Sequence, residues 1–119
     1  MTESEANLSV RAQEGVSIVE FQDRKILDEL CINQIGERLR ELVEDQPAPR
    51  LVLDFHNVEH LSSAALGMLI TLNKEVLGRQ GRLVLANIHP QIYEVFKITR
   101  LNKLFNIQAT TDEALKAFA

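Results

Sequence analysis

Two adjacent serines, Ser62 and Ser63, lie at the start of the run HLSSAALGMLITLNKEV, whose other residues are mostly apolar and spaced as in a buried helix. Serine at a helix start is most often a cap, because its side-chain oxygen accepts a hydrogen bond from a backbone N–H group of the first turn. A phosphoserine is also tolerated there, because free N–H groups and the positive end of the helix dipole favour negative charge. The pair therefore indicates a helix cap or a phosphorylation site.

Ester hydrolysis is another chemistry that a serine can perform. It needs a histidine base, a carboxylate that orients this base, and oxyanion donors. His60 lies shortly before Ser63, and Asp54 could supply the carboxylate. However, the serine is not in the G-x-S-x-G turn that exposes the nucleophile of α/β-hydrolases. We therefore expect that the protein is not an enzyme and that none of its residues is catalytic.

His56 and His60 have a spacing that binds zinc when both side chains project from the same face of a helix. Here they lie in the segment HNVEH, where we expect a loop, and neither a cysteine nor a clear third ligand is near. We therefore expect no metal site and no cofactor. The single cysteine, Cys31, excludes an internal disulfide and is typical of a small core residue.

The composition is that of one ordinary globular domain, with 119 residues of which 45% are hydrophobic and 25% charged. With a net charge of −4, the chain lacks the basic surface that a general nucleic-acid binder needs. Lys97, Arg100 and Lys103 recur at regular spacing, which is typical of a solvated face or a minor electrostatic contact.

The start of the sequence, MTESEANLSV, has neither the basic nor the apolar region of a secretory signal. The longest apolar stretch, Ala64 to Leu72, is about half the length of a membrane span. We therefore expect a cytoplasmic protein that does not insert into a membrane. Residues 1–7 are polar and acidic, and we expect them to be disordered, with a single domain over residues 8–119.

The first half of that domain predicts two strands and a helix. The segment LSVRAQEGVSIVEF predicts two short strands joined by a Glu-Gly turn. Apolar residues then recur at helical spacing from Leu30 to Val43, and Asp28 is suited to cap this helix. Pro47 and Pro49 end it.

The second half predicts strands and helices in alternation. The runs RLVLDF and LVLAN are continuously apolar, as central strands are, and they flank the helix that begins at the serine pair. Pro90 suits the first turn of the next helix. LNKLFNI predicts a last short strand, and TTDEALKAF a final helix with a Thr110–Glu113 capping box. The order β-β-α-β-α-β-α-β-α predicts an α/β fold, a single domain with a mixed, mainly parallel sheet layered with about four helices.

Three stretches of the sequence resemble the STAS domain family, whose best-known members are bacterial anti-sigma-factor antagonists. LVLDFHNVEHLSSAALGMLITLNKEV is similar to the family's buried strand, its F-x-x-V loop, and the D-S-S/T-G-L or S-S-A-G-L motif that opens a helix. RKILDE is similar to its G-x-L-D, and GRLVLANIHPQIYEVFKITRLNKLFNI to its next strand, proline-initiated helix and L-F-x-I close. Compared with the best-studied motif, Ser62 replaces an acidic residue, Ala64 a serine or threonine, and Ala65 a glycine.

The resemblance implies a protein that works by reversible binding. Its phosphorylatable serine falls on Ser63. The unphosphorylated form is then expected to bind a serine-kinase anti-sigma factor, which phosphorylates it and releases it until a serine phosphatase removes the phosphate. The partner-binding residues that we predict are Asp28, His56, Asn57, His60, Ser62, Ser63, Ala64 and Gly67.

Two alternatives stay open from the sequence. The chain is also compatible with a non-phosphorylated STAS subunit of a transporter complex, or with a signalling scaffold. Gly67, inside the predicted helix, indicates either close packing, a partner surface, or a tolerated surface glycine.

Overall fold

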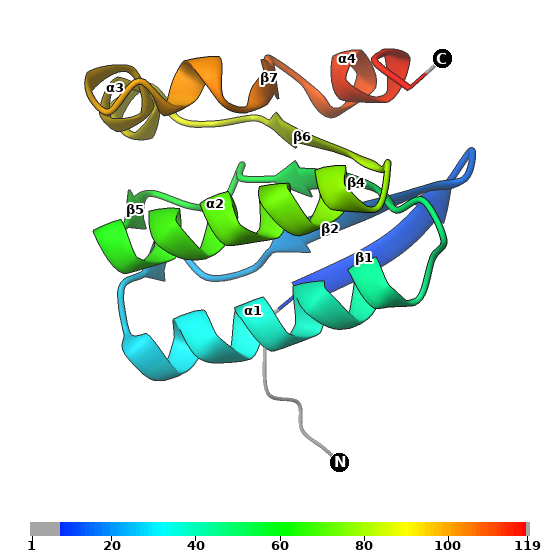
Figure 1. The fold of residues 1–119 in the computed structure, drawn as a ribbon. Coiled ribbons are helices and arrows are strands. Elements are labelled where there is room, and N and C mark those ends of the chain that lie inside the picture. The colour runs from blue at the N-terminus through cyan, green and yellow to red at the C-terminus, as the bar shows by residue number, and fades with distance from the viewer. Residues whose placement is uncertain (1–7, 119) are drawn as a thin grey trace.

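A computed structural model of the chain describes residues 8–118. The segment 1–7, for which the sequence predicts disorder, lies outside the described residues. Within them, a five-stranded sheet has the order β1-β2-β4-β6-β7 (Figure 1). Its strands are β1 (Leu8–Gln13), β2 (Val16–Phe21), β4 (Arg50–Asp54), β6 (Arg82–Ala86) and β7 (Asn106–Gln108). The hairpin β1–β2 is antiparallel and every other pair is parallel, which confirms the predicted mixed, mainly parallel sheet.

Four helices cover this sheet, as the sequence predicts: α1 (Glu29–Glu44), α2 (Ser63–Gly78), α3 (Pro90–Ile98) and α4 (Thr111–Lys116). Figure 1 shows α1 and α2 side by side in front of the strands. The segment LNKLFNI, in which a last short strand is predicted, begins with a short 3-10 helix, η1 (Leu101–Lys103), and its end joins the sheet as β7.

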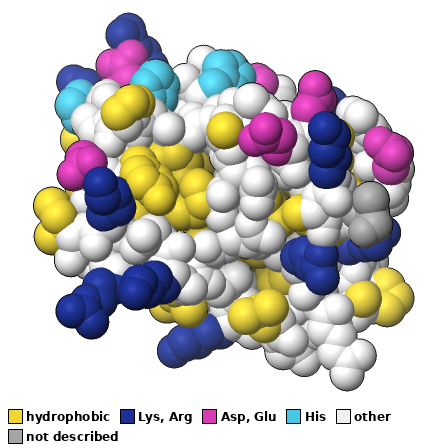
Figure 2. Space-filling model, turned by 90° about the horizontal axis from the view of Figure 1, so that it is seen from above, with side chains coloured by type: hydrophobic (Ala, Val, Ile, Leu, Met, Phe, Trp, Pro, Cys, Tyr) yellow, Lys and Arg dark blue, Asp and Glu magenta, His cyan; other side chains and the backbone are white. Residues whose placement is uncertain are grey.

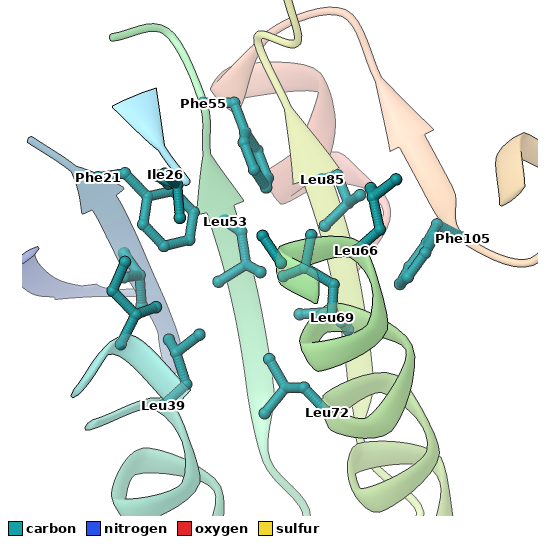
Figure 3. Close-up of a cluster of buried hydrophobic side chains, with 14 of the residues drawn as sticks. Phe21, Ile26, Leu39, Leu53, Phe55, Leu66, Leu69, Leu72, Leu85 and Phe105 are labelled. Atoms are coloured by element: carbon teal, nitrogen blue, oxygen red, sulfur yellow. The ribbon is translucent and has the colours of Figure 1, made fainter. Parts of the chain in front are cut away.

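The alternation of side chains along the strands divides the core into two parts. Leu51 and Leu53 of β4 point to the face covered by α1, α2 and α3, where the larger cluster of buried side chains lies. Val52, between them, points to the opposite face, where Ala114 of α4 covers a smaller cluster. Figure 3 shows the larger cluster, with Leu69 of α2 directed toward the strands.

A second, two-stranded sheet lies outside the main one and was not predicted. It pairs β3 (Lys25–Ile26) in parallel with β5 (His60–Leu61). Strands of two residues are too short for a periodic pattern, so the sequence gives no signal for them. Because β3 leads into α1 and β5 leads into α2, this pairing holds the two helix starts next to each other.

Candidate functional site

The two serines of the motif have different positions and different surroundings. Ser62 is the N-cap of α2, with extended backbone angles, and its side-chain oxygen accepts a hydrogen bond from the backbone N–H of Ala65 at 3.2 Å. Its own N–H donates to the carbonyl of Ile26 in β3 at 3.1 Å. Ser62 therefore performs the structural role of a cap and is held in place from both sides.

Ser63 is the first residue of α2 and is exposed. Within the part of the chain that the structure describes, its hydroxyl makes no hydrogen bond, and the backbone N–H groups of Ser63 and Ala64 have no acceptor either. A phosphate on this hydroxyl would lie at the positive end of the helix dipole, near unsatisfied N–H donors. The hydroxyl is thus accessible to a modifying enzyme, and its local environment tolerates the added charge.

Asp28 is the N-cap of α1, as Ser62 is the N-cap of α2. Its carboxylate accepts a hydrogen bond from the backbone N–H of Cys31 at 3.0 Å, which confirms the predicted N-cap. Ile26 pairs with Leu61 in the small sheet. Asp28 follows Ile26 by two residues, and Ser63 follows Leu61 by two residues. The exposed side chains of Asp28 and Ser63 therefore belong to one surface, at the shared end of two parallel helices.

The loop that leads from β4 to β5 is held by internal hydrogen bonds. The amide of Asn57 donates to the carbonyl of Phe21 at 3.1 Å, and Val58 is fully buried. The ring of His89 bonds to the carbonyl of His56 at 2.7 Å. Among the predicted partner-binding residues, Asn57 thus has a structural role, while His60 is exposed on β5.

Asp54, a buried carboxylate at the end of β4, does not form a catalytic triad with His60. One of its oxygens accepts hydrogen bonds from the backbone N–H of His56 at 3.0 Å and from the amide of Asn87 at 2.9 Å. The same oxygen lies 3.1 Å from Nδ1 of His56. No hydrogen bond in the described residues joins His60 to Ser63, so the arrangement that a serine hydrolase needs is not assembled here.

The sequence also did not predict which groups would meet at this end of the sheet. Glu20, Asp54 and His56 each place one potential metal-ligating atom within 4.8 Å of the others. His60, which the zinc hypothesis paired with His56, is not part of this group in the described residues. The sequence alone could not show this group, because Glu20 and Asp54 become neighbours only when β2 pairs with β4.

A groove of about 580 Å³ separates α1 from α2. Its lining residues are Glu29, Ile32, Asn33, Gly36, Glu37, Arg40, Ala64, Gly67, Met68, Thr71, Leu72 and Glu75. A Cβ atom on Gly67 would have no neighbour within 4 Å, so this glycine faces open space and close packing does not explain it. Gly36, across the groove on α1, does have a close neighbour, because a Cβ there would lie 3.3 Å from Cγ of Met68.

A smaller pocket of about 240 Å³ lies on the other side of α2, toward α3. Its lining residues are Glu59, His60, Leu61, Leu66, Gln91, Ile92 and Val95. Both hollows thus include residues from the start of α2, on opposite sides of that helix.

The thiol of Cys31, in the first turn of α1, is half-buried and lies 3.4 Å from a carboxylate oxygen of Asp23. Burial raises its pKa from 9.0 to about 11, and the hydrogen bond to Asp23 and the negative charges of Asp23 and Asp28 add to this. The thiol is therefore protonated at neutral pH and a poor nucleophile, as the sequence predicts for a structural cysteine.

The sequence identifies the family to which this arrangement belongs. A model of the STAS domain matches residues 7–114, and the chain belongs to this family. A candidate anti-sigma factor antagonist of Bordetella bronchiseptica, BtrV, is 32% identical over 74 residues, which cover 62% of this chain and 64% of that protein. The chain thus spans less than two thirds of the curated relatives that it matches.

Solved structures show the same fold. An anti-sigma-factor antagonist (STAS) domain protein from Planctomyces limnophilus has a TM-score of 0.85 at 23% identity, over 98% of this chain and 100% of that one. The Bacillus cell fate determinant SpoIIAA in its phosphorylated form has a TM-score of 0.69 at 17% identity, over 94% and 99%. Among the described residues, every helix is too short or too polar to cross a membrane.

Proposed function

We propose that this STAS domain is an anti-sigma-factor antagonist controlled by phosphorylation of Ser63. In the unphosphorylated state it binds a serine-kinase anti-sigma factor, which thereby loses its sigma factor. The kinase transfers the γ-phosphoryl group of ATP to the Ser63 hydroxyl, with ADP as the leaving group. A serine phosphatase later hydrolyses the phosphoserine to serine and inorganic phosphate, which restores the binding form.

The observation that carries this proposal is the division of roles between the two serines. Ser62 caps the helix, so its oxygen is already used by the backbone N–H of Ala65. Ser63 is exposed and its hydroxyl is unused within the described residues. A phosphate can therefore be added without breaking the cap, and its effect falls on whatever protein covers this surface. Relatives named as antagonists, and a structure of this fold in a phosphorylated form, support the same function.

Release follows from the cost of burying charge. A phosphoserine carries roughly −1.5 to −2 charge near neutral pH. If the partner covers Ser63, this charge loses its water on binding, and a buried charge without a matching group is costly. The unmodified hydroxyl is small and neutral, so it fits the same interface at little cost.

Titration calorimetry of the full chain with the serine-kinase anti-sigma factor of its own organism tests the proposal. We expect Ser63→Ala to bind like the wild type without accepting phosphate, and Ser63→Asp to bind more weakly. Ser62→Ala is the matched control, because it alters the neighbouring serine and leaves the acceptor hydroxyl in place. Equal affinities for Ser63→Ala and Ser63→Asp, or phosphate transfer to Ser62, would contradict the proposal.

A second candidate function is a STAS subunit that does not switch, in a transporter complex or a signalling scaffold. Three residues of the serine motif, Ser62, Ala64 and Ala65, favour this second function, because they differ from the residues of the best-studied phosphorylated motif. Ala65 is fully buried, so its methyl group is part of the core and not of the exposed surface. Mass spectrometry of the protein from its native cell separates the two functions, because only the first predicts phosphate on Ser63.

A further inference from the structure

Glu20, Asp54 and His56 bring three potential metal ligands together at the carboxyl ends of β2 and β4. Glu20 and Asp54 are partners in the register of these parallel strands, so both side chains project from the same face of the sheet. His56 follows Asp54 by two residues, and one ligating atom of each of the three residues lies within 4.8 Å of the other two. Figure 2 shows histidine and acidic side chains next to each other along one edge of the molecule.

The distances between these atoms fit the coordination shell of one metal ion. Nδ1 of His56 lies 3.1 Å from Oδ1 of Asp54 and 3.6 Å from Oε2 of Glu20. Zinc binds nitrogen and oxygen ligands at about 2.0–2.2 Å, so two ligands of a tetrahedral zinc ion lie roughly 3.3–3.6 Å apart. The observed distances are close to this range. One ion can therefore contact all three residues after small adjustments of their side chains.

The carboxylate of Asp54 is the group that favours an ion over a loop held by hydrogen bonds alone. Its side chain is only 9% exposed, so its charge is largely removed from water. The hydrogen bonds that it accepts within the described residues all go to Oδ1, from His56 and from the amide of Asn87, while Oδ2 has no donor there. A buried carboxylate oxygen without a donor is costly. A bound cation would neutralise the charge and satisfy this oxygen.

Neighbouring side chains hold the carboxylates in place, as they commonly do around metal ions. Nδ2 of Asn87 donates to Asp54 at 2.9 Å and also to Oγ1 of Thr111 at 3.0 Å. The amide of Gln22 donates to Oε1 of Glu20 at 2.9 Å, which leaves Oε2 for an ion. The ligands are therefore oriented before an ion arrives.

The site is accessible from solvent. The side chains of His56 and Glu20 are 46% and 34% exposed. A pocket of about 240 Å³ on the same face of the sheet is lined by Ser9, Val10, Arg11, Ile18, Glu20 and Asp54. An ion can therefore reach the ligands, and water can occupy its remaining position. Arg11 forms no ion pair within the described residues, so it does not neutralise either carboxylate directly.

We propose that Glu20, Asp54 and His56 bind a divalent transition-metal ion, for which zinc is the best match. One imidazole with two carboxylates suits zinc better than calcium or magnesium, which prefer oxygen ligands alone. The sequence led us to expect no metal site, because it offered His56 only His60 as a partner, whereas the fold supplies ligands from two strands. The inference goes beyond the proposed function, since zinc binding does not require phosphorylation of Ser63.

Calorimetric titration of the full chain with zinc chloride tests the proposal. We expect one ion per chain, and we expect His56→Ala and Glu20→Gln each to weaken binding by at least about tenfold. His60→Ala is the matched control, because it removes another exposed histidine from the same part of the chain and should leave the affinity unchanged. Arg11→Gln removes a positive charge from the lining of the adjacent pocket and should strengthen binding.

Thermal unfolding provides a second readout, because an ion that binds the folded chain raises its Tm. Zinc should raise the Tm of the wild type and of His60→Ala more than that of Glu20→Gln. Absence of zinc binding by the wild type overturns the inference, as does an unchanged affinity in His56→Ala. A loss in His60→Ala with none in Glu20→Gln would also overturn it. None of these measurements needs the kinase, so failure of phosphate transfer to Ser63 would overturn only the proposed function.

Discussion

The two hollows that flank α2 differ in size, lining and charge. The groove toward α1 is about 580 Å³ and carries Glu29, Glu37 and Glu75 at its edges, against the single basic residue Arg40. The pocket toward α3 is about 240 Å³ and is mainly apolar, with Glu59 and His60 among its lining residues. One helix thus separates a groove edged by acidic side chains from a mainly apolar pocket.

The residues of α2 explain this difference. Toward α1 the helix presents small side chains, Ala64 and Gly67, and Gly36 of α1 lies across from Met68, so the space between the helices stays open. Toward α3 it presents Leu66, which is largely buried. The α1 side therefore offers a wide groove with apolar and charged lining residues, and the α3 side offers a compact, mainly apolar pocket supported by the core.

Truncation of one side chain in each hollow should have the largest effect and should differ between the two. Leu66→Ala removes a side chain that is only 7% exposed, so we expect a loss of about 2–4 kcal/mol in the free energy of unfolding. Met68→Ala removes a half-buried side chain from the groove toward α1 and should cost about half as much. Urea denaturation measures both, and equal losses would show that the two hollows are packed alike.

The adjacent serines provide a smaller and sharper contrast. Ser62→Ala removes the oxygen that accepts from the Ala65 N–H, so we expect a loss of about 1 kcal/mol. Ser63→Ala removes an exposed hydroxyl and should change the stability by less than about 0.5 kcal/mol. Thermal and chemical denaturation of the two variants side by side is sufficient. A larger loss for Ser63→Ala would mean that the two roles are exchanged.

The smallest effect is a shift in the titration of Cys31, which reports the negative charge at the start of α1. The thiol is neutral below its pKa and negative above it, so burial and the neighbouring Asp23 and Asp28 disfavour the thiolate and raise the pKa to about 11. Alkylation by iodoacetamide should therefore still accelerate between pH 9 and about pH 11 in the folded protein. Asp23→Asn should lower this pKa while burial keeps it above the ordinary value.

The unfolded chain in urea is the control for this titration, because its thiol is exposed. A plateau of the alkylation rate near pH 9 in the folded protein would contradict the predicted shift. It would also mean that Asp23 and Asp28 contribute less negative charge around the thiol than their positions indicate.

The sequence predicts well those elements whose side chains repeat over many residues. The helix expected from Leu30 to Val43 is α1, and the runs RLVLDF and LVLAN are the adjacent strands β4 and β6 at the middle of the sheet. In such elements the buried positions recur at a fixed interval, so apolar residues recur at the same interval in the sequence. The pairing of β3 with β5 has no such pattern, and it is the feature that joins the starts of α1 and α2.

The site shows the same limit. The serine pair marks the start of α2, but the sequence left the cap and the phosphorylation site as alternatives, and only the structure assigns the cap to Ser62. Glu20 and Asp54 are distant in the sequence and become neighbours through strand register. The open space above Gly67 likewise depends on where α1 lies.

By itself, the sequence determined the order of the four helices and of the five strands of the main sheet, the family resemblance and the place of the serine pair at a helix start, because these depend on local patterns of residue type. Only the tertiary structure decided which surfaces flank α2: a groove edged by acidic side chains on one side and a mainly apolar pocket on the other. Such surfaces combine residues from helices that are far apart along the chain. Their shape and charge therefore exist only after the helices have packed on the sheet.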